Sequence, residues 1–330
     1  FVKKHKDKLL IGYISYDSAL KQHKVQSRHS IDPDVPGVQF LAFENWHEEN
    51  SPSAKPSQPL TGDSLKPQIT PEQYSASFKN IQQHIQQGDV YQVNLTHQLY
   101  GCTNKRAQEL FVDIIKQNPA NFAAYLGFNN FELLSASPER FIKIEQDQIT
   151  TQPIKGTIAK TNCPVSNKLN IQTLKDSEKE QAELNMITDL LRNDLNQVCQ
   201  TNSVQVVKHR SILECPNIYH TYSHIIGQLK VSPIQALISM LPAGSISGCP
   251  KKRSLEVIDQ QEYSRRGIYT GVIGYIHPNG ILDFSIAIRT LLKKGRQVNL
   301  GVGGGIVKDS VRENEYQETL QKAKSFRNIL

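Results

Sequence analysis

The 330-residue sequence contains no long apolar run, no paired cysteines and no dense basic segment. Its five cysteines are far apart and form no Cys-x-x-Cys pair, which argues against a disulfide framework and against a zinc site. No run of eighteen apolar residues is present, and no apolar segment follows the basic start, so we expect neither a membrane span nor a secretory signal. These absences favour a protein of the reducing cytoplasm.

The formal net charge of +7 raises the question of nucleic-acid binding. Much of the excess lies near the two ends, and the middle of the chain has no basic run interleaved with aromatic residues. We therefore expect no nucleic-acid partner and a mostly solvated charged surface. A non-catalytic binding module is the more distant alternative, and retention on DNA that does not depend on salt would eliminate it.

The chain divides into a short first region and a longer second one. Strands are expected over residues 9–16 and 37–43, where β-branched and aromatic residues lie between glycine and proline breaks. Residues 51–59 are rich in serine and proline, which is typical of a linker that cannot bury enough apolar surface to become ordered. We expect an abbreviated amino-terminal strand region with its linker over residues 1–69 and the main domain over residues 70–330.

The main domain opens with a strong helix signal. Residues 70–73 (TPEQ) combine an N-cap threonine, a proline at the first helical position and a capping-box glutamine. The following segment, residues 90–96, alternates like a strand and places the amides of Gln92 and Asn94 on one face. Such amides face solvent or contact a ligand, and the pattern leaves both interpretations open.

Two helices carry carboxylates on or beside the face expected to pack inward. Glu180 and Glu183 fall beside the apolar stripe of a helix expected over residues 176–198, and Glu315 and Glu318 repeat this spacing in the last helix. Inward carboxylates cost several kcal/mol unless they are paired or coordinated. Two such helices facing each other could hold one Mg²⁺.

Each of these carboxylates also has a plainer interpretation. The helix glutamates could form surface ion pairs with Lys179 or Lys322. Glu139 follows a proline in a turn between apolar strands, where burial can raise the pKa of a carboxyl as a general acid requires. The alternative is that Glu139 pairs with Arg140.

Three further features could contact an anionic ligand. Lys155 lies in the segment 152–157 (QPIKGT), between a proline-fixed extended stretch and a glycine, and is either held against a ligand or exposed in a turn. Arg289 lies in an apolar stretch expected as a strand over 281–292 and is either a carboxylate clamp or part of a structural ion pair. Two glycine-rich segments, 244–251 and 301–305, match no nucleotide fingerprint, but their backbone N–H groups can bind a carboxylate, the second just before a helix.

Six ordered segments between residues 70 and 330 together resemble the chorismate-utilising enzymes. They are residues 88–96, 137–141, 153–157, 183–195, 244–251 and 303–319. The resemblance implies an α+β fold of the anthranilate synthase component I type, in which two antiparallel β-sheets form a sandwich with helices outside. Residues 70–330 would then be the chorismate-binding catalytic domain.

The resemblance also implies a covalent mechanism. Lys155 would attack C2 of chorismate, Glu139 would protonate the departing C4 hydroxyl, and ammonia would enter at C4 as the lysine leaves. The attack requires a neutral amine, so we expect burial or a neighbouring positive charge to favour that form of Lys155.

The remaining site residues are implied in the same way. Mg²⁺ would hold the C1 carboxylate of the substrate, with Glu183 and Glu318 as direct ligands and Glu180 and Glu315 close by. The substrate-binding positions would be Arg289, Tyr269, Gly303, Gly304, His220, Lys251, Ser245 and Gln92.

Two positions distinguish the branches of the family. Relatives that form isochorismate or salicylate have a lysine where this chain has Gln92, and anthranilate synthases have alanine at the position of Lys155. The resemblance therefore implies formation of 4-amino-4-deoxychorismate, on the route to 4-aminobenzoate and folate, with anthranilate formation as the alternative. No Gly-x-Cys-x-Gly nucleophile elbow is present, so we expect ammonia from a separate glutamine amidotransferase subunit.

Overall fold

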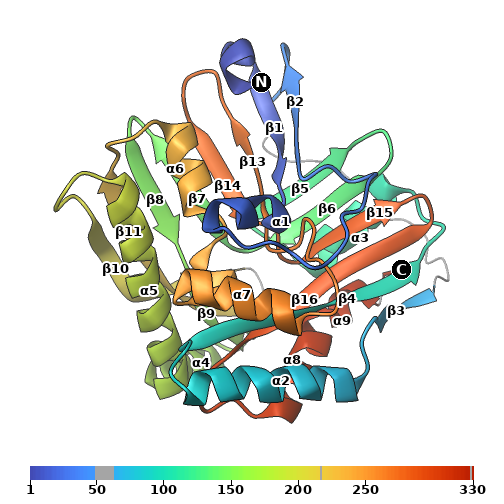
Figure 1. The fold of residues 1–330 in the computed structure, drawn as a ribbon, viewed down its shortest axis with the longest axis vertical. Helices are drawn as coiled ribbons and strands as arrows, with labels where there is room; N and C mark the ends of the chain where they lie inside the picture. Colours follow the sequence, from blue (N-terminus) through green and yellow to red (C-terminus); the bar gives the residue numbers. More distant parts are fainter. Residues whose placement is uncertain (49–62, 216–217, 328) are drawn as a thin grey trace.

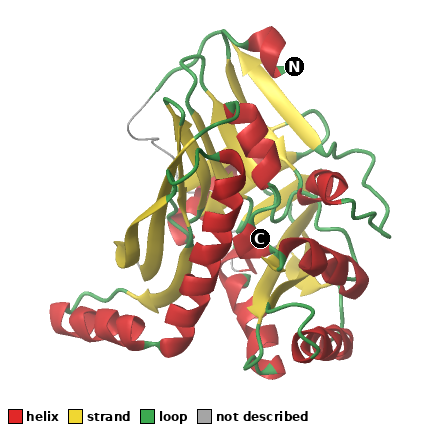
Figure 2. Ribbon diagram, turned by 60° about the vertical axis from the view of Figure 1, so that its left-hand side comes forward, coloured by secondary structure: helices red, strands yellow, loops and turns green. Residues whose placement is uncertain are grey.

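The computed structural model describes residues 1–48, 63–215, 218–327 and 329–330. Two antiparallel sheets organise this part of the chain, and helices pack around them (Figures 1 and 2). Within the described residues, one sheet has nine strands in the order β10-β11-β8-β7-β14-β13-β1-β2, with β9 paired to β11. The other has seven, in the order β12-β4-β16-β15-β6-β5, with β3 paired to β4. The expected α+β fold is confirmed.

The bounds of the elements are as follows. The nine-stranded sheet contains β1 (Leu9–Ile14), β2 (Val38–Phe43), β7 (Arg140–Glu145), β8 (Gln148–Gln152), β9 (Ile154–Ala159), β10 (Gln205–Glu214), β11 (Ile218–Gln228), β13 (Val272–Ile276) and β14 (Leu282–Ile286). The seven-stranded sheet contains β3 (Asp63–Pro67), β4 (Gln92–Cys102), β5 (Phe122–Gly127), β6 (Glu132–Ser137), β12 (Gly248–Cys249), β15 (Thr290–Lys294) and β16 (Gln297–Ile306). The helices are α1 (Tyr16–Leu20), α2 (Pro71–Gln86), α3 (Ala107–Gln117), α4 (Pro164–Asp176), α5 (Glu178–Val198), α6 (Pro233–Met240), α7 (Lys251–Gln261), α8 (Arg312–Lys322) and α9 (Lys324–Arg327), with short 3₁₀ turns η1 (Val2–His5), η2 (Lys21–His23) and η3 (Gly244–Ile246).

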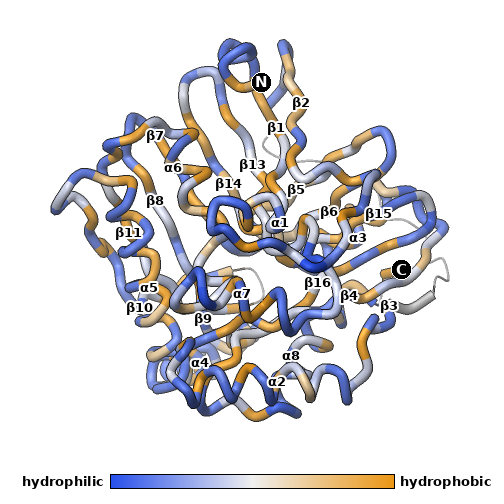
Figure 3. Tube along the Cα trace, in the orientation of Figure 1, coloured by the Kyte–Doolittle hydropathy of each residue, from blue (hydrophilic) through white to orange (hydrophobic). Residues whose placement is uncertain are grey.

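Helix α2 begins where its sequence signal predicts. Thr70 Oγ1 accepts the N–H of Gln73 at 3.2 Å, and Gln73 Oε1 accepts the N–H of Thr70 at 2.9 Å, so the predicted capping box is confirmed. Polar and apolar segments alternate along this helix in Figure 3, and its apolar face, which includes Phe78 and Ile81, is buried. None of the described helices is long and apolar enough to cross a membrane.

The amino-terminal strands belong to the nine-stranded sheet. β1 lies between β2 and β13, with Gly12 opposite Phe40 on one side and opposite Gly274 on the other. β3, at residues 63–67, pairs with β4 of the other sheet. The serine- and proline-rich stretch expected as a linker, residues 51–59, lies outside the described residues.

Two connections carry the chain from one sheet to the other. β6 of the seven-stranded sheet continues into β7 of the nine-stranded sheet, and β14 continues into β15 in the opposite direction. The two crossings are hydrogen bonded to each other, because Ala136 N–H donates to the Arg289 carbonyl at 3.0 Å and Ile286 N–H donates to the Glu139 carbonyl at 3.1 Å. Glu139 and Arg289 therefore lie side by side where the strands change sheets.

Several expected elements differ in the structure. The strand expected over 281–292 is broken into β14 and β15, and Arg289 in the break has a φ of +49° because the chain turns there from one sheet to the other. The glycine-rich residues 301–305, expected to present backbone N–H groups just before a helix, lie inside β16, where they pair with β4.

Candidate active site

A cavity of about 570 Å³ opens beside the two sheet crossings. Both sheets and helices α5 and α8 contribute to its wall. It brings together every predicted site residue except Gln92 and Lys251. The predicted residues that line it are Glu139, Lys155, Glu180, Glu183, His220, Ser245, Tyr269, Arg289, Gly303, Gly304, Glu315 and Glu318.

A larger cavity of about 1070 Å³ lies on the other side of Tyr269 and Gly301, which line both spaces. The rest of its wall includes α1, the loop that follows it, residues 263–268 and parts of β4, β6, β15 and β16. Neither Glu139 nor Lys155 nor any of the four predicted metal-binding glutamates lines it. We identify the smaller cavity as the candidate site, because the predicted catalytic and metal-binding side chains line it and do not line the larger one.

Glu139 lies in the cavity wall, and its carboxyl is almost fully buried. It is 7% exposed, and burial raises its pKa from 4.5 to about 7, against the opposing effects of the Lys155 charge and of hydrogen bonds from Ser245 and the Ile154 N–H. Arg140 does not pair with it, because its guanidinium forms an ion pair with Asp283 at 3.0 Å. The expected desolvation of this turn glutamate is confirmed, and a carboxyl with this pKa can donate a proton near neutral pH.

Lys155 reaches the cavity from β9. The hydroxyl of Thr221 donates to the Lys155 carbonyl at 2.6 Å and fixes this strand on β11, and Gly156 follows with a φ of +64° where a Cβ would lie 2.8 Å from Leu174. The Lys155 ammonium lies 3.5 Å from Glu183 Oε2, and its side chain is 18% exposed. The Glu183 carboxylate is thus the ion-pair partner of this amine within the cavity wall.

Helices α5 and α8 bring four glutamates to one side of the cavity. Burial and the neighbouring Glu183 raise the pKa of Glu180, and burial raises that of Glu315, which Glu318 raises further. Partial burial also acts to raise the pKa of Glu318, but an ion pair at 2.8 Å with its helix neighbour Lys322 outweighs this and lowers it. The negative charge of this cluster is therefore only partly compensated.

The cluster suits a hard cation in its chemistry but is not preassembled around one. Among the described residues, no three histidine, cysteine or carboxylate side chains lie close enough together to form a metal-binding group. Carboxylate oxygens with uncompensated charge are nevertheless the ligands that Mg²⁺ prefers. The donor set therefore fits a divalent cation in its chemistry.

Arg289 and His220 present unpaired groups on the opposite side. No ion pair or side-chain hydrogen bond of Arg289 is found among the described residues, and burial lowers the pKa of its guanidinium below its usual value. His220 Nδ1 lies 2.9 Å from the Gly156 carbonyl and 3.0 Å from Thr157 Oγ1, whereas its buried Nε2 has no partner in the described part of the chain. The lack of an ion-pair partner among the described residues argues against the structural ion pair considered from the sequence. The guanidinium can instead bind a ligand carboxylate.

Two predicted residues lie outside the cavity wall. The Lys251 ammonium lies 2.6 Å from a carboxylate oxygen of Asp194, a buried pair on the other side of η3. Gln92 is 1% exposed and packs behind Gly305, whereas Asn94, its neighbour on the same strand face, lines the cavity. Both amides are thus buried, and only that of Asn94 can reach a ligand there.

Two lysines of the wall were not predicted as site residues. Lys322 donates to the Gly303 carbonyl at 2.8 Å, and Lys179 lies 3.9 Å from both Glu183 and Glu315. Their position one helical turn from a predicted glutamate is the signal that could have identified them. The ion pairs of Lys179 with Glu183 and Glu315, and of Lys322 with Glu318, confirm in part the alternative that the helix glutamates pair with these lysines.

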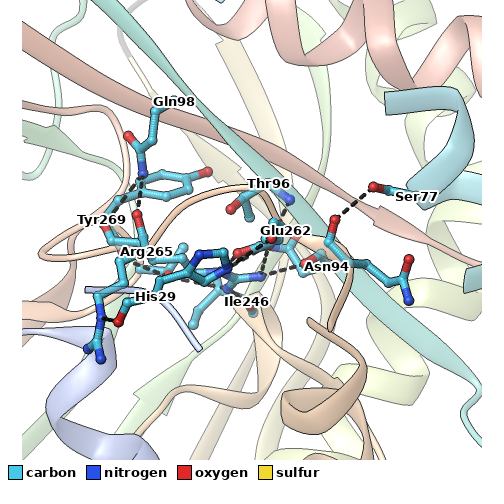
Figure 4. A network of polar contacts seen from close by, with 12 residues as sticks. His29, Ser77, Asn94, Thr96, Gln98, Ile246, Glu262, Arg265 and Tyr269 are labelled. Atoms are coloured by element: carbon cyan, nitrogen blue, oxygen red, sulfur yellow. Dashed lines mark hydrogen bonds and ion pairs between the residues drawn. The ribbon is translucent and has the colours of Figure 1, made fainter. Parts of the chain in front are cut away.

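A buried ion pair supports the cavity from behind. Arg266 and Glu262 are 1% and 4% exposed and lie 2.7 Å apart. Arg266 donates to the carbonyls of Asn94 and Ile246, and Glu262 accepts the N–H of Thr96 at 2.9 Å. Figure 4 shows this network linking the strand of Asn94 and Thr96 to the segment of Ile246, so the pair fixes two walls of the site relative to each other.

The sequence matches the family model of chorismate binding enzymes over residues 2–328. The chain belongs to this family. Among solved structures, the chorismate-binding fold of this chain is similar to anthranilate synthase component I from Streptococcus pneumoniae TIGR4, with a TM-score of 0.85 and 27% identity, covering 97% of this chain and 80% of that one. The family relationship and fold expected from the six sequence segments are confirmed.

Curated relatives include two activities within this chorismate-binding family. The chain is 38% identical over 279 residues to aminodeoxychorismate synthase component 1 of Escherichia coli (strain K12), covering 84% of this chain and 61% of the relative. It is 35% identical over 260 residues to anthranilate synthase component 1 of Aquifex aeolicus (strain VF5), covering 78% and 53%. The chain thus spans less than two thirds of the length of these relatives.

Proposed function

We propose that this chain aminates chorismate at C4 and forms 4-amino-4-deoxychorismate through a covalent adduct with Lys155. One arrangement carries the proposal. A lysine amine and a buried carboxyl with a pKa of about 7 share a cavity with an arginine that has no ion-pair partner among the described residues. A nucleophile, a general acid and a carboxylate clamp are the three groups that displacement of a poor hydroxyl leaving group from an anionic substrate requires.

The steps balance without an oxidant or reductant. The neutral amine of Lys155 forms a bond to C2, both ring double bonds shift by one position toward C4, and the C4–O bond breaks as Glu139 delivers its proton to the departing hydroxyl, which leaves as water. Ammonia then bonds to C4 and gives one proton back to Glu139, both double bonds return, and the C2–N bond breaks to release Lys155 as a neutral amine. Arg289 holds a substrate carboxylate throughout, because it is partly desolvated and has no competing partner in the described structure.

Mg²⁺ is the cofactor that this proposal includes. Glu183 and Glu318 would bind it most directly, with Glu180 and Glu315 near it, and its charge would neutralise a carboxylate of the substrate. A cation at these glutamates would also compete with Lys155 for Glu183, which lies 3.5 Å from the amine. That competition would release the amine from its ion pair, so that it could approach the substrate.

Anthranilate formation is the second candidate, favoured by the 35% identity to the Aquifex aeolicus relative. What distinguishes it is Lys155, which lines the cavity here and is replaced by alanine in the anthranilate branch that the sequence resembles. A lysine adduct at C2 blocks that carbon and directs ammonia to C4. The name "component 1" of the relatives is consistent with a separate partner, and we propose that a glutamine amidotransferase subunit supplies the ammonia.

Product analysis tests the function. The protein is incubated with chorismate, Mg²⁺ and ammonium, and the products are identified by mass spectrometry with and without an added aminodeoxychorismate lyase. We expect 4-amino-4-deoxychorismate without the lyase and 4-aminobenzoate with it. Anthranilate as the main product would overturn the proposal in favour of the second candidate.

A matched pair of lysine variants isolates the nucleophile. Lys160 lies near Lys155 in sequence, but it pairs with Glu214 at 2.6 Å and does not line the cavity. We expect Lys155→Ala to lose amination at C4 and Lys160→Ala to retain it.

A further inference from the structure

Three lysines contact the glutamates of the candidate cation site, and one of them differs from the others. Lys155 contacts Glu183 of α5, and Lys322 contacts Glu318 within its own helix α8. Among the described lysines, Lys179 alone forms ion pairs within 4.0 Å with carboxylates of both acidic helices, with Glu183 Oε1 and Glu315 Oε1 each 3.9 Å from its ammonium. Its charge therefore lies between the two helices.

Lys179 is much more exposed than its two carboxylate partners. Its side chain is 58% exposed, compared with 15% for Glu183 and 5% for Glu315. At 3.9 Å neither contact is a hydrogen bond, so no directional bond holds the ammonium. A mostly solvated lysine can turn into water at little cost, while the buried Glu315 and the partly buried Glu183 are more stable with a positive charge near them.

We propose that the Lys179 ammonium is a resident counter-ion of this site, which bridges Glu183 and Glu315 and which a divalent cation must displace in order to bind. The inference rests on the proposed cation site, and it adds a residue that sets the affinity of that site. Lys179 keeps the carboxylates of α5 and α8 together without metal and weakens the binding of metal by competing for the same oxygens. Lys179 therefore raises the concentration of divalent cation that is needed to fill the site.

Direct metal titration tests the inference. Protein freed of metal with a chelator is titrated with Mn²⁺, and binding is followed by the electron paramagnetic resonance signal of the free ion. We expect Lys179→Met to bind Mn²⁺ roughly threefold to tenfold more tightly than the unchanged protein, since a partly exposed positive charge near 4 Å is removed. The difference should shrink at about 1 M salt, where exposed charges are screened within about 3 Å.

Two variants control for effects other than charge at this position. Lys179→Arg keeps the positive charge and should bind Mn²⁺ about as the unchanged protein does. Lys175→Met removes an exposed lysine of α4 that does not line the cavity, and it should leave the affinity unchanged. A thermal melt in chelator gives a second measurement, in which Lys179→Met should unfold at a lower temperature and gain more from added Mn²⁺.

The outcomes separate this inference from the proposed function. Equal or weaker Mn²⁺ binding by Lys179→Met, with normal binding by the unchanged protein, overturns the counter-ion role and leaves the proposed reaction standing. An unchanged protein that binds no Mn²⁺ overturns the cation site itself, and the inference with it. A rise in the KM for chorismate in Lys179→Met without any change in metal affinity would reassign Lys179 to substrate binding and overturn the inference.

Discussion

Replacing Glu139 by glutamine should stabilise the protein at alkaline pH and remove its activity. The carboxyl is 7% exposed, and burial raises its pKa from 4.5 to about 7. Because the folded value lies above the unfolded one, ionising Glu139 costs stability. The cost is absent below about pH 4.5, grows as the pH rises toward 7 and is complete above that value.

The size of the effect follows from the two pKa values. A difference of roughly 2.5 between 4.5 and about 7 corresponds to about 3 kcal/mol. Glutamine removes this cost and keeps an oxygen that can accept the hydrogen bonds from Ser245 and the Ile154 N–H. We expect Glu139→Gln to raise the free energy of unfolding by up to about 3 kcal/mol at pH 8.5 and by little at pH 4.5.

Urea unfolding at the two pH values, followed by circular dichroism, measures the difference. Glu145→Gln is the control, because Glu145 is half-exposed in β7 and pairs only with Lys143 among the described residues. Its effect should stay within about 0.5 kcal/mol at both pH values. A gain for Glu139→Gln that is the same at pH 4.5 and pH 8.5 would refute the buried-charge argument.

The same substitution should lower the rate of chorismate turnover about 10²–10⁴-fold, because glutamine cannot donate the proton. In the unchanged protein, kcat/KM should fall as the pH rises above about 7, when Glu139 loses that proton. Steady-state assays from pH 6 to 9 measure both effects. Turnover that stays near normal in Glu139→Gln would exclude Glu139 as the general acid.

Substitutions at Lys155, Arg289, Glu318 and Arg266 test other parts of the site. Lys155→Ala should abolish amination at C4 with ammonium, measured by mass spectrometry, and full amination in this variant would exclude the covalent route. Arg289→Met should raise the KM for chorismate about 10- to 100-fold, because the ion-paired clamp is lost, and Arg289→Lys should recover only part of it. Glu318→Gln should require about tenfold more Mg²⁺ for half-maximal activity, and an unchanged requirement would remove Glu318 from the cation site. Arg266→Met should lower the free energy of unfolding by about 3–5 kcal/mol in a urea titration, because it leaves the charge of Glu262 buried and unpaired; replacing both residues by methionine should restore much of the loss.

The sequence alone determined the elements whose signals are local. The capping box at residues 70–73 places the start of α2, and the apolar stripe of α5 places Glu180 and Glu183 beside its buried face. The proline-containing turn before Arg140 identifies Glu139 as a carboxyl whose pKa burial can raise. These signals depend on residues within one helical turn or one strand, so they can be read without knowing the fold. The ordered segments likewise identified the family over most of the chain.

Tertiary structure alone decided what depends on residues far apart in the chain. The break at Arg289 arises because β14 and β15 belong to different sheets, and no local pattern records that change. Lys251 is paired with Asp194 across η3, whereas Lys179 lies between α5 and α8, although both are lysines in the first turn of a helix. The partner of a charged side chain is set by which elements pack together, and this packing follows from burial of the whole core rather than from any short segment.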